Sequence, residues 1–152
     1  HLVLSTLHTN SAVGAMTRLR DMGVEPFLLS SSLVGVLAQR LVRKLCPYCK
    51  QPHPATPTDC EVLNVDPATP PTLYVPAGCA QCNQSGYRGR TGIFELVTVD
   101  ETMQSLIHEG RGEQELERHA RLSSASIRDD GRRRVLAGDT ALAELVRVTR
   151  ED

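Results

Sequence analysis

The sequence has no tryptophan, and its two phenylalanines and three tyrosines make up 3% of 152 residues. A core without many large rings must be filled by leucine, valine, isoleucine and alanine. A chain of this length can bury about 70% of the surface that its unfolded form exposes. The sequence is therefore long enough for one packed domain, or for one domain with a small insert.

Neither sign of charge is in excess: 17 lysines and arginines face 18 aspartates and glutamates, for a net charge of -1. A nucleic-acid-binding domain usually carries a basic face, so nucleic acid is not expected as a partner. No apolar run approaches the roughly 20 residues of a membrane helix, and the longest, Phe27 to Leu37, is interrupted by three serines. We expect a soluble chain.

The sequence also lacks an initiator methionine, a charged signal-peptide start and a Gly-x-x-x-x-Gly-Lys-Ser/Thr loop. His1 leads directly into the apolar residues 2–4. We expect that the chain is cut from a longer protein, in which further motifs precede His1.

The apolar and capping residues predict an alternation of strands and helices, typical of the α/β class. Residues 2–7 predict a buried strand, and a helix follows from Ala12 until Gly23 stops it. Pro26 opens a second helix, whose apolar stripe extends to Leu37. Further strands are predicted at 40–45, where a continued helix would also fit, and at 93–99. Further helices are predicted at 100–110, 113–122, 127–136 and 141–148.

The segment between Cys46 and Cys82 contains eight prolines, which leave room for little more than a short helix near 59–63. Two Cys-x-x-Cys motifs bracket it, and we call them the first knuckle (residues 46–49) and the second knuckle (residues 79–82). Together they supply four thiolates, the ligand set of a tetrahedral zinc ion. The predicted zinc ligands are Cys46, Cys49, Cys79 and Cys82.

Four protein thiolates leave no open position for a substrate, so the predicted metal is structural. Its binding free energy of ~10–16 kcal/mol would order the proline-rich insert. Cys60 lies outside both knuckles and is read as a buried or free thiol, and His53 is a weaker alternative ligand. A redox site would need only one knuckle, and disulfides would need an oxidising compartment, so both are the less favoured hypotheses.

Two further positions suggest phosphate chemistry. His8 follows the first predicted strand, where α/β sheets bind ligands and where a helix N-terminus favours anions. Taken alone, His8 is better explained as an ordinary hydrogen-bonding turn residue. Residues 86–92 are read as a glycine-rich turn, in which Arg90 could contact a phosphate or a neighbouring subunit.

Taken together, these segments resemble the family of secretion and pilus assembly ATPases. Residues 1–10 are similar to its histidine box, 37–46 to the stretch that leads into its zinc insert, and 86–93 to the segment after the second knuckle. Val148-Thr149 resembles the family's closing residues. Residues 22–33 resemble the type II secretion branch more than the type IV pilus branch, and retraction ATPases lack the four-cysteine insert.

The resemblance implies the C-terminal part of a RecA-like P-loop ATPase core at 1–45, a zinc insert at 46–83, and a returning strand with a helical region at 84–152. It implies a hexameric ring on the cytoplasmic face of the bacterial inner membrane. The expected partner there is the cytoplasmic domain of an inner-membrane secretion-platform protein. ATP hydrolysis with Mg²⁺ would drive assembly of a pseudopilus that helps to export proteins.

The resemblance also implies roles for single residues. His8, together with His1, would lie near the γ-phosphate and link hydrolysis to subunit movement, and Arg90 would contact nucleotide or a neighbouring subunit. Because the Walker A loop and the acidic boxes are missing, the chain alone is expected to be inactive. The alternatives are a type IV pilus assembly ATPase and a non-enzymatic zinc-binding interaction module.

Overall fold

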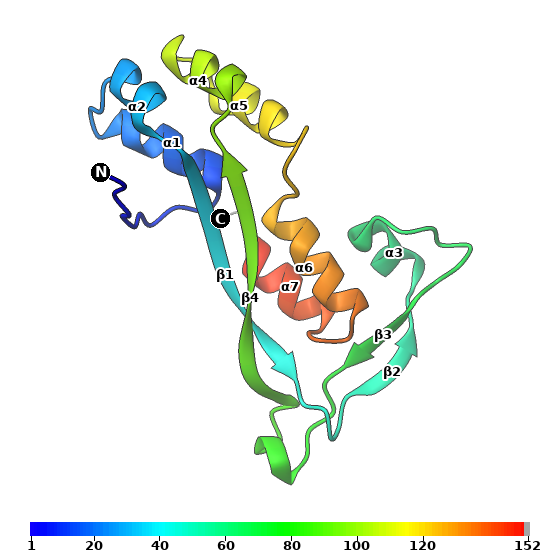
Figure 1. The fold of residues 1–152 in the computed structure, drawn as a ribbon. Coiled ribbons are helices and arrows are strands. Elements are labelled where there is room, and N and C mark those ends of the chain that lie inside the picture. The colour runs from blue at the N-terminus through cyan, green and yellow to red at the C-terminus, as the bar shows by residue number, and fades with distance from the viewer. Residues whose placement is uncertain (151–152) are drawn as a thin grey trace. The chain divides into compact units, whose positions relative to one another are not determined.

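Residues 1–150 are described by a computed structural model, and they form two compact units. The first unit contains residues 1–38 and 94–126, and the second contains 39–93 with the residues from 127 onward. Two long strands, β1 (Gly35–Leu45) and β4 (Tyr87–Thr98), pair with each other and run in opposite directions (Figure 1). Within the described residues, no helix is both long and apolar enough to cross a membrane.

The first unit is mainly helical. Ser11 begins its first helix by accepting a hydrogen bond from the Gly14 N–H at 2.9 Å. Pro26, whose fixed φ suits the first turn of a helix, begins the second. The four helices are α1 (Ala12–Asp21), α2 (Pro26–Ser32), α4 (Glu101–His108) and α5 (Glu113–Ala120).

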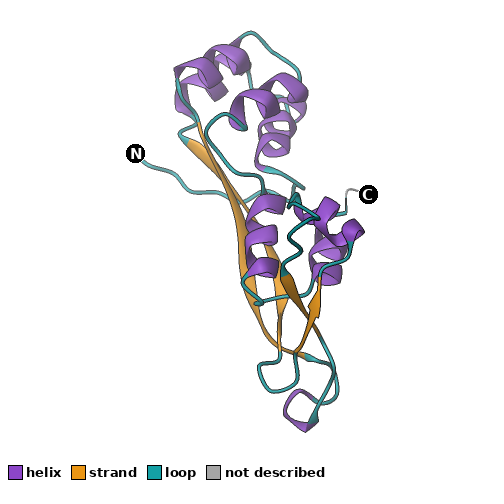
Figure 2. Cartoon of the chain, turned by 90° about the vertical axis from the view of Figure 1, so that its right-hand side faces the viewer, coloured by secondary structure: helices purple, strands orange, loops and turns teal. Residues whose placement is uncertain are grey.

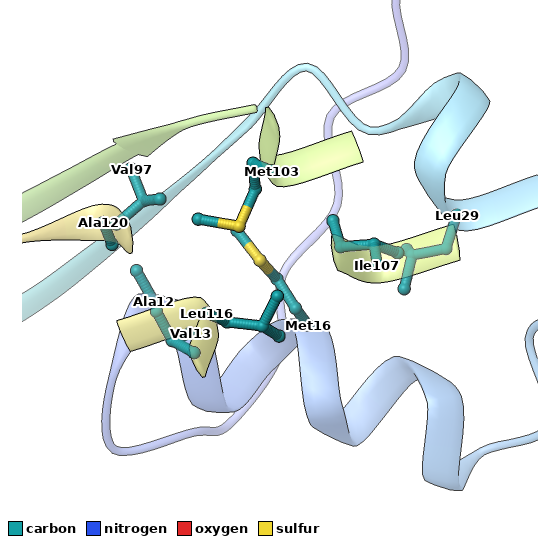
Figure 3. Close-up of a cluster of buried hydrophobic side chains, with 9 residues drawn as sticks. All are labelled: Ala12, Val13, Met16, Leu29, Val97, Met103, Ile107, Leu116 and Ala120. Carbon is teal, nitrogen blue, oxygen red and sulfur yellow. The ribbon is translucent and has the colours of Figure 1, made fainter. Parts of the chain in front are cut away.

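These helices cover the ends of the two long strands with a small apolar core. Its side chains converge from α1, α2, β4, α4 and α5 (Figure 3). None of them is aromatic, in agreement with the sequence's shortage of large rings. The buried residues are Ala12, Val13, Met16, Leu29, Val97, Met103, Ile107, Leu116 and Ala120.

Asp100 caps α4 and also ties it to α5. Its carboxylate accepts the Met103 N–H at 2.7 Å and contacts Nε2 of His119 at 2.8 Å. We expect Asp100→Ala to lower the free energy of unfolding by about 1 kcal/mol, because a helix N–H loses its acceptor. Asp100→Asn keeps a capping oxygen and should cost less. Urea denaturation measures both, and equal losses would show that the cap contributes nothing.

Two predictions for the first unit are wrong. Residues 2–7 form no strand, and Leu2, Val3 and Leu4 are exposed. A strand needs a neighbour for its N–H and C=O groups, and none of the described strands pairs with this segment. The second helix ends at Ser32 instead of extending to Leu37, because residues from Gly35 onward pair with β4.

The second unit contains the proline-rich insert. Strand β2 (Gln51–Pro54) pairs antiparallel with β3 (Thr72–Val75), and α3 (Pro57–Leu63) lies between them in the chain (Figure 2). Helices α6 (Ile127–Leu136) and α7 (Leu142–Thr149) complete the unit. The helices predicted from 100 onward are confirmed, with small shifts at their ends, and the strand predicted at 93–99 is part of β4, which begins earlier, at Tyr87.

The expectation that the prolines exclude regular structure beyond a short helix is wrong for β2. Pro52 and Pro54 lie within this strand, opposite Tyr74 and Thr72. The Ala55 N–H donates to Pro71 across the pair, so with a period of two the N atoms of Pro52 and Pro54 face away from β3. A two-stranded pair has only edge strands, where proline is tolerated.

Candidate metal centre

Each knuckle is a tight turn that its own backbone closes. In the first, the Cys46 carbonyl accepts the N–H groups of Cys49 at 3.3 Å and Lys50 at 3.0 Å. In the second, the Cys79 carbonyl accepts those of Cys82 at 3.2 Å and Gln84 at 2.9 Å. The second knuckle includes η1 (Ala80–Cys82), a single 3-10 turn. The spacing of two residues therefore brings both cysteines of a knuckle to the same side of its turn.

The fold brings the two knuckles together. The four-cysteine cluster contains Cys46, Cys49, Cys79 and Cys82, whose sulfurs all lie within 4.8 Å of one another. The sulfurs of Cys79 and Cys82 are 3.8 Å apart, and the pairs 46–79 and 49–82 are each 3.9 Å apart. A regular tetrahedron with zinc–sulfur bonds near 2.3 Å has edges of about 3.8 Å. The cluster therefore has the dimensions of a tetrahedral zinc site.

Backbone N–H groups point at two of the sulfurs. The sulfur of Cys82 accepts from the N–H of Cys79 at 3.3 Å and of Gly86 at 3.2 Å, and Cys49 accepts from Gly78 at 3.3 Å. Burial opposes ionisation of Cys82, but these N–H donors lower its pKa to about 6. Burial and the neighbouring thiols raise the pKa of Cys79 to about 11. A divalent cation would favour the thiolate form of all four.

Cys60 and His53, the other metal-binding candidates in the insert, lie outside this cluster. Cys60 is buried in α3, outside the cluster, as its position in the sequence predicted. The ring of His53 contacts the Pro54 carbonyl at 2.8 Å. All five cysteines are free thiols, so the structure does not favour the disulfide hypothesis.

The three residues predicted to act on nucleotide are all exposed. His1 and His8 are exposed in the segment that precedes α1. Arg90 is exposed within β4, because residues 87–92 continue this strand and do not form the predicted turn. The roles of these three residues stay predictions.

A buried carboxylate, which the sequence analysis did not identify, joins α7 to β1. Glu144 is 1% exposed, and its oxygens accept from the backbone and guanidinium of Arg43 and from Arg147, at 2.7 to 3.0 Å. Hydrogen bonds from Arg147, and then from Arg43, lower the pKa of Glu144 to about 2 against the opposing effect of burial. The spacing of Glu144 and Arg147 on a helix could have suggested that pair, but Arg43 is distant in the sequence.

The Arg43 guanidinium also lies 4.1 Å from the centre of the Tyr87 ring, on the strand that follows the second knuckle. Directly after the first knuckle, Lys50 donates to the Gly138 carbonyl at 2.8 Å. The Lys50 nitrogen also lies 4.5 Å from the centre of the Tyr74 ring. The strands beside both knuckles are thus held to the α6–α7 region by cationic side chains.

Comparison with known proteins gives a family match over nearly the whole chain. Residues 1–147 match the family described as "Type II/IV secretion system protein". The chain is 66% identical over its full length to "Type II secretion system protein E" of Pseudomonas aeruginosa, and 58% identical over 99% of its length to "Type II secretion system ATPase E" of Vibrio cholerae. A protein E of Aeromonas hydrophila is 57% identical over the full length. The chain spans 30% of the length of each of these curated relatives.

Proposed function

Because the chain belongs to the type II/IV secretion system protein family, we propose that it is the C-terminal part of an ATPase that powers type II protein secretion. The supporting observation is that the chain is 66% identical, over its full length, to a type II secretion system protein E. A second relative, 58% identical, is named an ATPase. ATP hydrolysis by the complete protein would drive pseudopilus assembly.

In this proposal the four-cysteine cluster holds a structural zinc ion. The support is the near-tetrahedral spacing of the sulfurs and the N–H donors that surround them. The zinc supplies no reaction chemistry, because four thiolates saturate it. It would join the end of β1 to the start of β4, which the first and second knuckles adjoin.

The complete protein would carry the nucleotide site. It would be a cytoplasmic homo-hexamer on the inner membrane, recruited by the cytoplasmic domain of a secretion-platform protein. ATP and Mg²⁺ would bind to residues outside this chain, in a Walker A loop that the sequence lacks. His8 and His1 would sense the γ-phosphate, and Arg90 would face nucleotide or the next subunit. The RecA-like character of the core is part of the proposal.

The proposal can be tested on His8 in the complete protein. We expect His8→Ala to lower kcat for ATP hydrolysis by about 100-fold, the lower end of the loss seen when one donor to developing charge is removed, with little change in nucleotide affinity. Steady-state hydrolysis and fluorescent-nucleotide titration measure the two quantities. His108→Ala, an exposed helical histidine in the same unit, is the matched control.

Equal turnover in the wild type and His8→Ala would refute the role of His8. A complete wild-type protein that neither binds nor hydrolyses ATP would refute the ATPase proposal itself and favour the non-enzymatic zinc module. A type IV pilus role would instead be shown by loss of pili, with normal protein export, when the gene is deleted.

A further inference from the structure

Gly86 contacts both knuckles through its backbone. Its N–H donates to the sulfur of Cys82 at 3.2 Å, in the second knuckle. Its carbonyl accepts the N–H of Cys46 at 2.9 Å, at the start of the first knuckle. One residue outside the four-cysteine cluster therefore makes hydrogen bonds to both of its halves.

The structure leaves no room for a side chain at this position. Gly86 has φ +74°, in the left-handed region that favours glycine. A Cβ atom built there would lie 2.4 Å from Cβ and 3.0 Å from Cα of Pro76, which leads from β3 toward the second knuckle. Part of this obstacle is backbone, so a change of side-chain rotamer could not relieve it.

From these contacts we propose that Gly86 is a positioning residue for the zinc site, an inference that rests on the zinc site proposed above. Its N–H orients the Cys82 sulfur, and its carbonyl fixes the first knuckle beside the second. Groups of this kind around a metal ligand typically contribute 10- to 100-fold to metal affinity. A Cβ at Gly86 would push the chain away from Pro76 and weaken both hydrogen bonds.

Gly89 is a matched control on the same segment. It has φ +75°, so alanine there meets the same backbone strain as alanine at Gly86. A Cβ at Gly89, however, has no atom within 4 Å. The difference between Gly86→Ala and Gly89→Ala therefore isolates the contact with Pro76 and the two hydrogen bonds from the effect of a positive φ.

The experiment compares zinc affinity of the complete protein and its two variants by competition with a chromophoric chelator. Gly86→Ala is expected to bind zinc about 10- to 100-fold more weakly than the wild type, and Gly89→Ala much less so. Co²⁺ in place of zinc adds a spectroscopic readout, since the visible bands of tetrahedral thiolate-bound Co²⁺ should change in Gly86→Ala and persist in Gly89→Ala. Equal zinc affinity in the two variants would overturn the proposal.

A variant-free measurement covers the case in which Gly86→Ala does not fold. In the zinc-loaded wild type, hydrogen exchange should show protected amides at Gly86 and Cys46, which become exchangeable after chelation. Unchanged protection of these amides would overturn the role of Gly86 while leaving the zinc site intact. If the wild type binds neither zinc nor Co²⁺, the zinc site fails, and this inference fails with it.

Discussion

Cys79→Ser is expected to abolish zinc binding and to melt residues 46–82, while most of the helical signal persists. The insert has two short strands and one short helix of its own, so its order depends on the cross-link between the knuckles. Structural zinc sites contribute about 10–16 kcal/mol of binding free energy, far more than a few hydrogen bonds. Serine places a weak oxygen donor where one of four thiolates should be. Elemental analysis gives the zinc content, and limited proteolysis with thermal melting reports the insert.

Cys60→Ser is the matched control for this change. Cys60 is equally a cysteine of the insert and is buried, yet it lies outside the four-cysteine cluster. We expect Cys60→Ser to retain one zinc ion per chain. Its thermal stability should fall only slightly, because a hydroxyl replaces a buried thiol. Loss of zinc in Cys79→Ser with unchanged thermal stability would contradict the structural role of the metal.

Glu144→Gln is expected to lower the free energy of unfolding by about 2–3 kcal/mol at neutral pH. A pKa held at about 2 instead of 4.5 corresponds to about 3 kcal/mol, and the partial exposure of the guanidinium partners reduces this somewhat. The amide keeps the shape of the side chain but not its charge. Chemical denaturation of the wild type and the variant measures the difference.

The effect of Glu144 should depend on pH in a defined direction. Because its pKa is lower in the folded state, the carboxylate stabilises the fold fully above about pH 4.5. This contribution is lost as the pH falls toward 2, where the folded state also becomes protonated. The gap between the wild type and Glu144→Gln should therefore be constant at neutral pH and shrink between pH 4.5 and 2. Release of zinc by acid affects both proteins and cancels in the difference.

Glu109→Gln provides a comparison in which the ion pair is exposed. Glu109 contacts Arg111 at 2.9 Å, but the two side chains are 51% and 49% exposed. Such surface pairs contribute about 0–1 kcal/mol. An equal loss of stability in Glu109→Gln and Glu144→Gln would show that burial of Glu144 does not strengthen its ion pairs.

Local signals were sufficient to predict the turn of each knuckle and most helices. Each knuckle is a turn closed within a few residues, so the spacing Cys-x-x-Cys predicts its geometry without knowledge of the rest of the fold. The helix that begins after Asp100 likewise follows from its cap and from the apolar spacing along one segment. The long-range partner of Glu144 has no such signal, because Arg43 lies 101 residues away.

The predictions that were wrong concern strands and the ends of helices, where pairing decides the conformation. Residues 86–92 contain three glycines and suggested a turn, yet Tyr87 to Gly92 continue β4 because β1 supplies a partner. Residues 2–7 have the composition of a strand and no partner among the described strands. Pro52 is tolerated in β2 only because that strand pairs on one side.

The sequence by itself determined which residues could bind a metal, where most helices begin, and to which family the chain belongs, since all three depend on residue types at short spacing. Only the tertiary structure decided that the knuckles meet, that Gly86 joins them and that Glu144 is buried between two arginines. The physical reason is that a strand's hydrogen bonds and a buried charge are satisfied by partners distant in the chain, which local patterns do not specify.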